Sequence, residues 1–323
     1  MTDEPRIEPY DGPAGGWGSL RSVEGILLRE ARLASGSVTL LKQNKPDGFS
    51  CVSCAWAKPD EPRAFEYCEN GAKATAWEIT RKRVETRFFE EHTLTELRKW
   101  PDHDLEAEGR LLHPMRLDRA RDRWVRVSWE DAFREIGAEL RAFDPKATVF
   151  YASGRAALET SYMWALFARL YGHNNLPDSS NMCHESTSVA LPEAIGASVG
   201  TVMLKDFDST ECILNFGQNV GSNSPRMLHP LQEAAKRGVP IITFNPLRER
   251  GLERFTNPQS PVEMLTGSET TISEQYHQVK AGGDIAAILG VSKALIEGDD
   301  ATRAAGGKPW LDHRFLAKHT HGF

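Results

Sequence analysis

Residues 211–250 of this 323-residue chain read ECILNFGQNVGSNSPRMLHPLQEAAKRGVPIITFNPLRER, and this stretch decides the fold class. Residues 211–216 and 240–244 are short apolar runs of the length that strands have. Residues 225–237 between them have the apolar spacing of a helix, and Gly238 follows where a helix C-terminus favours glycine. A strand, a helix and a second strand in this order predict an α/β fold with a parallel sheet covered by helices.

The same alternation continues on both sides of this stretch. Asp284 opens a predicted helix, and its carboxylate is suited to capping the free N–H groups there. The glycine-rich run at 12–18 indicates an irregular N-terminal arm. The other predicted elements are a strand at 147–152, helices at 130–143, 158–171 and 284–297, and a hairpin at 115–129 with its turn at 119–122. We therefore expect a doubly wound parallel-sheet domain that follows a smaller N-terminal domain.

Three of the five cysteines, Cys51, Cys54 and Cys68, lie in one short stretch near the N-terminus. The two-residue gap between Cys51 and Cys54 lets both sulfurs face one metal ion or cluster. This spacing leaves a structural zinc site and an iron–sulfur cluster open as alternatives. Cys212 lies in an apolar predicted strand, so we expect it to belong to the core.

Three polar loops flank the predicted strands and helices, where unpaired N–H groups bind anions. The loop at 217–224, GQNVGSNS, is rich in small and amide residues and is a candidate seat for a pyrophosphate. Asn245 and Arg248 follow the next strand and offer an amide and a guanidinium. Gly283 and Asp284 precede a helix, with a carboxylate for a guanine edge or a ribose. Such loops are often only turns, but together they favour a nucleotide-bearing cofactor.

Cys183 and His184 are adjacent in the segment SSNMCHE at 179–185. N–H groups at the start of a short helix there would favour a thiolate, and the histidine would exchange protons near pH 7. A role in packing is the plainer alternative. A cysteine-protease dyad of Cys183 with His173 or His184 is another.

Composition limits the classes of function. The chain is 40% hydrophobic and 26% charged, with a formal net charge of −6, so it gives no support for a nucleic-acid or membrane partner. No apolar run approaches the roughly 20 residues that cross a bilayer, and the N-terminus has no signal core or twin-arginine pair. We expect a cytoplasmic protein with reduced cysteines, because an odd number at uneven spacing argues against a disulfide framework.

Several long motifs, in this order along the chain, resemble those of the molybdopterin oxidoreductase family. The resemblance begins near Lys42 and is greatest to the branch of soluble formate dehydrogenase alpha-like and YdeP-type proteins. The motifs are CVSCAW (51–56), FEYCENGAKA (65–74), FYASGRAALETSYMWALFARLYGHNNLPDSSNMCHESTSVAL (150–191), FGQNVGSNSPRMLHPLQEAAKRG (216–238), ITFNPLRERGLERF (242–255) and KAGGDIAAILGVSKALIE (280–297).

This resemblance implies a formate dehydrogenase-like molybdenum oxidoreductase that uses bis-molybdopterin guanine dinucleotide. Cys183 stands at the position of the molybdenum ligand, and His184 at that of a histidine that handles the substrate proton. Cys51, Cys54 and Cys68 correspond to ligands of a [4Fe-4S] cluster, which favours iron–sulfur over zinc. The positions matched to cofactor-binding residues are Gly217, Asn219, Gly221, Ser222, Asn223, Asn245, Arg248, Gly283 and Asp284.

Two positions depart from the family pattern. Lys58 stands where members have a third closely spaced cysteine, so one iron would need a noncysteine ligand. Asn70 replaces a lysine that lies between cluster and pterin, and Lys73 is the candidate to substitute for it. Arg155 is a candidate for an anion contact. A catalytically inactive remnant that acts as a binding or regulatory module is the alternative function.

The resemblance also divides the chain. We expect an irregular arm at 1–45, a cluster-binding domain at 46–145 and an α/β molybdopterin-binding domain at 146–323. Full family members are more than twice as long, so we expect a truncated chain that exposes apolar surface where the missing C-terminal part docks. The implied partners are a small-molecule substrate such as formate, that missing part of the fold, and a redox partner.

Overall fold

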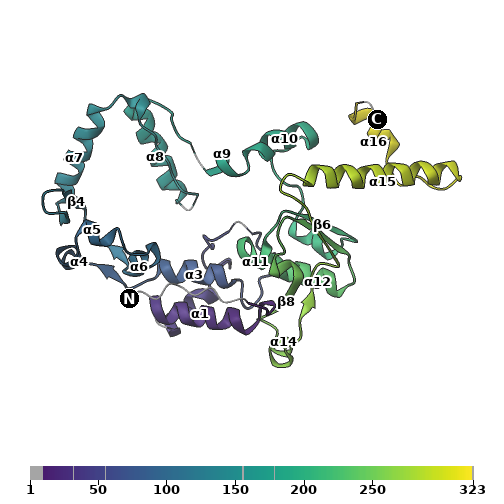
Figure 1. Ribbon diagram of the computed structural model, residues 1–323, viewed down its shortest axis with the longest axis horizontal. Coiled ribbons are helices and arrows are strands. Elements are labelled where there is room, and N and C mark those ends of the chain that lie inside the picture. Colours follow the sequence, from purple (N-terminus) through teal and green to yellow (C-terminus); the bar gives the residue numbers. More distant parts are fainter. Residues whose placement is uncertain (1–9, 32, 55, 155, 178, 322–323) are drawn as a thin grey trace.

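The computed structural model describes residues 10–31, 33–54, 56–154, 156–177 and 179–321 (Figure 1). The first half contains β1 (Ala14–Gly15), α1 (Gly16–Glu30), α2 (Leu33–Leu41), α3 (Glu69–Glu78), β2 (Arg83–Val84), α4 (Thr86–Glu91), α5 (Leu94–Leu97), α6 (Asp102–Ala107), β3 (Arg110–Leu111), β4 (Met115–Asp118), β5 (Arg123–Arg126) and α7 (Trp129–Ala142). The second half contains α8 (Leu158–Tyr171), α9 (Ser179–Cys183), α10 (Glu185–Ile195), β6 (Ile213–Phe216), α11 (Val220–Asn223), α12 (Leu228–Lys236), β7 (Ile241–Asn245), α13 (Arg250–Glu253), β8 (Arg254–Thr256), α14 (Pro261–Thr266), β9 (Thr270–Thr271), β10 (Gln275–Gln278), α15 (Asp284–Ala304) and α16 (His313–His319).

A parallel sheet is the centre of the second half. Its strands lie in the order β10-β7-β6, and Phe216 of β6 is in register with Phe244 of β7. Helix α12 covers the sheet through Leu231, which is fully buried with Ile241 and Leu252. The predicted α/β class, with a parallel sheet over 211–244, is therefore confirmed. That the sheet is doubly wound stays a prediction.

The predicted irregular arm is wrong for residues 16–30 and 33–41, which form α1 and α2. Ile26 and Leu27 of α1 pack on Ala72 and Ala76 of α3, so the apolar face that follows the glycines determines the local structure. The glycines instead mark the start of the helix, where Gly15 has φ +81°. Strand β1 pairs in parallel with β8, which fastens the N-terminal segment to the second half of the chain.

The hairpin at 115–129 and the helices at 130–143 and 158–171 are confirmed by β4, β5, α7 and α8. The predicted strand at 147–152 is wrong, because within the described residues this segment is paired with no other strand. Phe150 is buried there among Trp164 and Phe167, so its apolar character serves an aromatic cluster.

Two smaller predictions are also wrong. The helix predicted at 284–297 is confirmed by α15, but Asp284 is its first residue rather than its N-cap, and the N-cap is Gly283, which has no side chain to form a cap. Cys212 is exposed and does not belong to the core. It precedes β6, which lies at an edge of the sheet, and Leu214 on the same face is also 49% exposed.

Several helices carry apolar faces that nothing in the described chain covers. Helix α7 buries no residue, and α8 and α15 bury only Ala168 and Asp299. These helices project from the rest of the molecule in Figure 1. The accessible surface is 22488 Å², whereas a compact chain of this mass exposes about 13,000 Å². The predicted exposure of apolar surface is thus observed. No helix of the described residues is both long and apolar enough to span a membrane.

Candidate functional site

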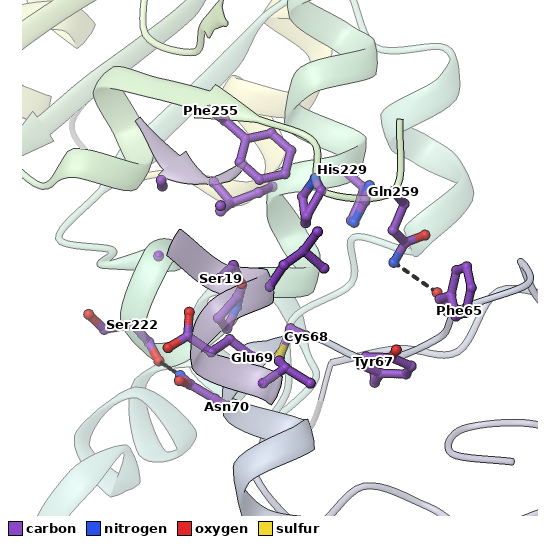
Figure 2. A pocket seen from close by; sticks show the side chains of 18 residues that line it. Ser19, Phe65, Tyr67, Cys68, Glu69, Asn70, Ser222, His229, Phe255 and Gln259 are labelled. Atoms are coloured by element: carbon purple, nitrogen blue, oxygen red, sulfur yellow. Dashed lines mark hydrogen bonds between the residues drawn. The ribbon is translucent and has the colours of Figure 1, made fainter. Parts of the chain in front are cut away.

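A cleft of about 410 Å³ lies where the cysteine segment meets the parallel-sheet region (Figure 2). Ser19 of α1 lies on one side, Cys68 and Asn70 at the start of α3 on another, and Ser222 of α11 on the third. The side-chain amide of Asn70 donates to the carbonyl of Ser222. Residues far apart in sequence therefore meet at a junction between the cysteines and the polar loop after β6.

Cys68 is the most firmly positioned of the three cysteines. Its side chain caps α3 by accepting the Gly71 N–H at 3.4 Å. The pKa of the Cys68 thiol is raised to about 11, mainly by burial and also by the nearby charges of Cys54 and Cys51, against the lowering effect of hydrogen bonds from the backbone N–H groups of Gly71 and Asn70. The three sulfurs are thus close enough to interact electrostatically, as ligands of one cation would be.

Cys51 and Cys68 converge on Gly71. A Cβ atom on this glycine would lie 3.0 Å from the Cys51 sulfur and 3.8 Å from the Cys68 sulfur. Cys51 is held by its own N–H, which donates to Asn44 Oδ1 at 2.9 Å, and its sulfur accepts the Ser53 N–H at 3.4 Å. Glycine at position 71 therefore leaves open the space between the two sulfurs.

The third cysteine completes the set less closely. Cys54 lines a shallow hollow of about 650 Å³ together with Cys51 and Leu158. Among the residues that the structure describes, no three or more His, Cys, Asp or Glu side chains are gathered as a metal site. Lys58 donates to Ser50 Oγ at 2.7 Å, and Lys73 pairs with Glu69 at 2.7 Å.

An ion pair attaches the cysteine segment to the sheet region. Arg226 and Glu66 lie 2.6 Å apart, with only 10% and 6% of their side chains exposed. Glu66 also accepts the N–H of Arg63, and its carbonyl accepts the side-chain amide of Asn44. The carboxylate of Glu66 therefore connects the loop before Cys68 to Arg226, which lies between α11 and α12.

We expect Glu66→Ala to destabilise the fold by about 3–5 kcal/mol, because it leaves the Arg226 guanidinium buried without its partner. The measurement is the free energy of unfolding in urea. Glu269→Ala is the matched control: its pair with Arg254 is 2.8 Å long but more than a third exposed on both sides, so it should cost less than about 1 kcal/mol. Equal losses in the two variants would contradict a special role for Glu66.

His229 adjoins this ion pair in the wall of the cleft. Nη1 of Arg63 and Nδ1 of His229 lie 3.0 Å apart, and the imidazole packs edge-on against Phe255. Burial, together with the charges of Arg63 and Arg226, lowers the pKa of His229 to about 4. The ring is therefore neutral at pH 7 and accepts a hydrogen bond from the guanidinium.

The depressed pKa of His229 makes the stability of the fold depend on pH. Below the ordinary pKa of about 6.5 the unfolded chain binds a proton that the folded chain does not bind until about pH 4, so stability falls as the pH falls through this window. Between pH 7 and 5 the wild type should lose about 2 kcal/mol more than His229→Gln, which keeps the acceptor but does not titrate. Urea unfolding at both pH values measures this difference. His103→Gln, at an exposed ring, should behave as the wild type does.

The loops after β6 and β7 approach each other closely. Gly217 has φ +65°, and Asn219 caps α11 by accepting the Ser222 N–H at 3.2 Å. A Cβ atom on Gly251 would lie 2.8 Å from the Cα atom of Gly221. Gly221 and Ser222 line the cleft, whereas Gly217, Asn219 and Asn223 are absent from its walls. Glycines at 221 and 251 are required for this contact between loops.

The other predicted nucleotide contacts are arranged differently. Asn245 is 4% exposed, and its amide donates to the carbonyl of Gln218 at 3.3 Å, so it supports the loop from inside. Arg248 stays 55% exposed, pairs with Glu253 and lies over the ring of Tyr276. Gly283 and Asp284 begin α15 and do not line the cleft.

Cys183 and His184 lie outside the cleft. Cys183 is exposed at the end of α9, and His184 is the N-cap of α10 without a side-chain hydrogen bond to that helix. The cysteine therefore precedes a helix N-terminus, as the sequence indicated. Arg155 lies outside the described residues.

Four residues of the site carried no signal in the sequence. Gln43 lies in the run KQNK, which is typical of a surface loop, yet it is fully buried beside Cys51 and Cys68. Glu66, Arg226 and His229 are polar residues whose partners lie far away in the sequence.

A family model described as molybdopterin oxidoreductase matches residues 110–312. Protein YdeP of Escherichia coli is 48% identical over 98% of this chain and 42% of its own length. An uncharacterized oxidoreductase of Mycobacterium tuberculosis is 40% identical over 89% of this chain and 36% of its own. The F420-dependent formate dehydrogenase 1 subunit alpha of Methanococcus maripaludis is 24% identical over 68% of this chain and 28% of its own. The chain thus spans less than half the length of these relatives.

Proposed function

Because the chain belongs to the molybdopterin oxidoreductase family, we propose that it carries the electron-transfer segment and part of the cofactor site of a molybdenum-dependent, formate dehydrogenase-like oxidoreductase. The observation that carries the proposal is the position of Cys68 in one cleft with Gly221 and Ser222 of the segment after β6. Cys51 and Cys54 interact electrostatically with Cys68, so the cysteine segment and a segment suited to phosphate groups meet at this cleft.

The cysteine segment fits an iron–sulfur cluster in three respects. The sulfurs of Cys51 and Cys68 face the space that Gly71 leaves open, and each accepts a backbone N–H. A buried side-chain N–H of Gln43 near them has no partner in the described residues. Cys51, Cys54 and Cys68 would hold a [4Fe-4S] cluster with a noncysteine fourth ligand, and the bound cluster would supply one-electron transfer.

The second half of the chain fits part of a dinucleotide site. The loop that contains Gly221 and Ser222 begins at the carboxyl end of a parallel strand, where N–H groups favour phosphates. Arg248 presents a half-exposed guanidinium after the next strand. Bis-molybdopterin guanine dinucleotide, when bound, would supply two-electron oxidation or reduction.

Cys183 and His184 are the proposed catalytic residues. The exposed thiol of Cys183 would ligate molybdenum, and His184 would accept or donate the substrate proton. Lys73 would contact the pterin, although in the structure it pairs with Glu69. Gly283 and Asp284 would contact a guanine of the cofactor. The remaining part of the family's fold would complete that site.

The substrate we propose is formate or another small oxyanion. The proposed partners are the remaining part of the family's fold, which would cover the apolar faces of α7, α8 and α15, and a redox protein. We place this activity in the cytoplasm, without nucleic-acid or membrane partners.

Metal analysis after anaerobic purification tests the proposal. We expect iron and molybdenum in the chain, and an electron paramagnetic resonance signal from a reduced cluster. The absence of both metals at meaningful occupancy would exclude this function for the chain. Stoichiometric zinc without iron–sulfur absorption would instead indicate a structural zinc protein.

A second candidate function is a catalytically inactive binding or regulatory module. The observation that favours it is Lys58, which occupies the expected cysteine position and bonds to Ser50 at the surface. A metal-free chain that still forms a stable complex with another protein would favour this candidate over the enzyme.

A further inference from the structure

Gln43 has a buried side-chain amide whose oxygen is hydrogen-bonded and whose nitrogen is not, among the described residues. The residue is 0% exposed, and Nε2 has no hydrogen-bond partner among the described residues. Its other end is occupied, because the hydroxyl of Thr75 donates to Oε1 at 2.9 Å. Thr75 is itself buried in α3, so the amide is held in one orientation.

The amide N–H group of Gln43 lies near the cysteine sulfurs. A Cβ atom on Gly71 would lie 2.6 Å from Gln43 Nε2 and 3.0 Å from the Cys51 sulfur. The amide nitrogen and the two sulfurs of Cys51 and Cys68 therefore surround the same small space. A buried N–H is costly when it is unpaired, so its position beside these acceptors requires a partner there.

We propose that Gln43 is a positioning and tuning residue that donates an N–H···S hydrogen bond to the Cys51 thiolate of a bound iron–sulfur cluster. This inference rests on the proposed function, because it assumes the cluster. The two thiolates already accept backbone N–H groups from Ser53 and Gly71. Gln43 adds a side-chain donor that is fully buried.

Such a donor favours the reduced state. Reduction adds negative charge to the cluster and its thiolates, and a hydrogen bond stabilises the more negative state. The amide of Gln43 therefore raises the reduction potential. Thr75 acts through Gln43, because its hydroxyl donates to Oε1 and so leaves Nε2 as the end of the amide near the sulfurs.

The test uses the whole chain, loaded anaerobically with ferrous iron and sulfide. The midpoint potential is then measured by a dye-mediated redox titration with electron paramagnetic resonance detection. Gln43→Met, which keeps the length of the side chain but removes the donor, should favour oxidation by about tenfold, a shift of roughly 59 mV to lower potential. Thr75→Val should shift the potential in the same direction by a smaller amount.

Gln232→Met is the matched control. Gln232 is also 0% exposed, but its amide bonds to Glu263 and Thr270 in the sheet region. This variant should keep the wild-type potential even where it lowers stability. If Gln43→Met does not fold, the shift in Thr75→Val decides the question.

The outcomes distinguish a failure of the proposed cluster from a failure of the role proposed for Gln43. If the wild type takes up no iron and sulfide, the proposed cluster and this inference are both wrong. If the cluster forms but neither Gln43→Met nor Thr75→Val shifts its potential, only the role of Gln43 is wrong. A loss of iron from Gln43→Met without a shift in the remaining cluster would show an iron ligand rather than a hydrogen-bond donor, and would also overturn it.

Discussion

The Cys68→Ser variant should bind at least about tenfold less iron than the wild type after anaerobic loading, and its cluster absorption should be lost. Serine is a good N-cap, so its hydroxyl can still accept the Gly71 N–H that the Cys68 sulfur accepts in the wild type. What the substitution removes is the thiolate. A hydroxyl does not ionise near neutral pH, and iron–sulfur clusters are held by thiolates. Iron content and visible absorption measure the effect.

Cys212→Ser is the control for this experiment. Cys212 is exposed at the edge of the sheet, outside the walls of the cleft, so its loss should leave the bound iron unchanged. Wild-type iron content in Cys68→Ser would remove Cys68 from the ligand set. Loss of iron in both variants would mean that general unfolding, rather than ligation, explains the result, and circular dichroism would detect it.

The Cys183→Ala variant should lose all measurable turnover while it retains its iron and cluster signals. The reason is distance in the fold: Cys183 ends α9 and is exposed, whereas Cys51 and Cys68 converge on Gly71 near α3. If Cys183 ligates molybdenum, its removal affects the substrate-converting site alone. Formate-dependent reduction of a dye, on protein with measured iron and molybdenum, gives the turnover.

Cys212→Ala serves as the control here as well, because it also removes an exposed thiol. Turnover in Cys183→Ala at the wild-type rate would show that the cysteine is not the molybdenum ligand. A parallel fall in iron and turnover would instead indicate that the loop near α9 supports the cysteine segment.

Local pattern was enough to predict many elements. The apolar spacing in α8 and α12 and the alternation in β4 and β5 predicted these elements at or near their observed bounds, because helical and strand periodicity are short-range properties of the sequence. Strand β10, with the sequence QYHQ, was missed because it has no apolar pattern and exists through its pairing with β7. For residues 147–152 the prediction is wrong for the opposite reason. The apolar pattern of a strand is present, but no strand of the described residues pairs with this segment.

The residues of the candidate site also fall into two groups: those that the sequence indicated and those that only the folded chain brings together. Cysteine spacing indicated Cys51, Cys54 and Cys68 as candidate ligands, because residues close in sequence can face one metal whatever the rest of the fold is, and their role as ligands stays a prediction. The loop at 217–224 was found because it follows a strand. Glu66 and Arg226 could not be paired from the sequence, because 160 positions separate them and nothing local marks either one.

The sequence by itself determined the family, the α/β class and the positions of the thiols, since these depend on residue type and short-range spacing. The tertiary structure alone decided that Gln43 is buried with its N–H beside two sulfurs, that Glu66 and Arg226 join the two halves, and that His229 is neutral. Burial and charge pairing depend on which distant segments pack together, and that is a property of the folded chain rather than of any local stretch.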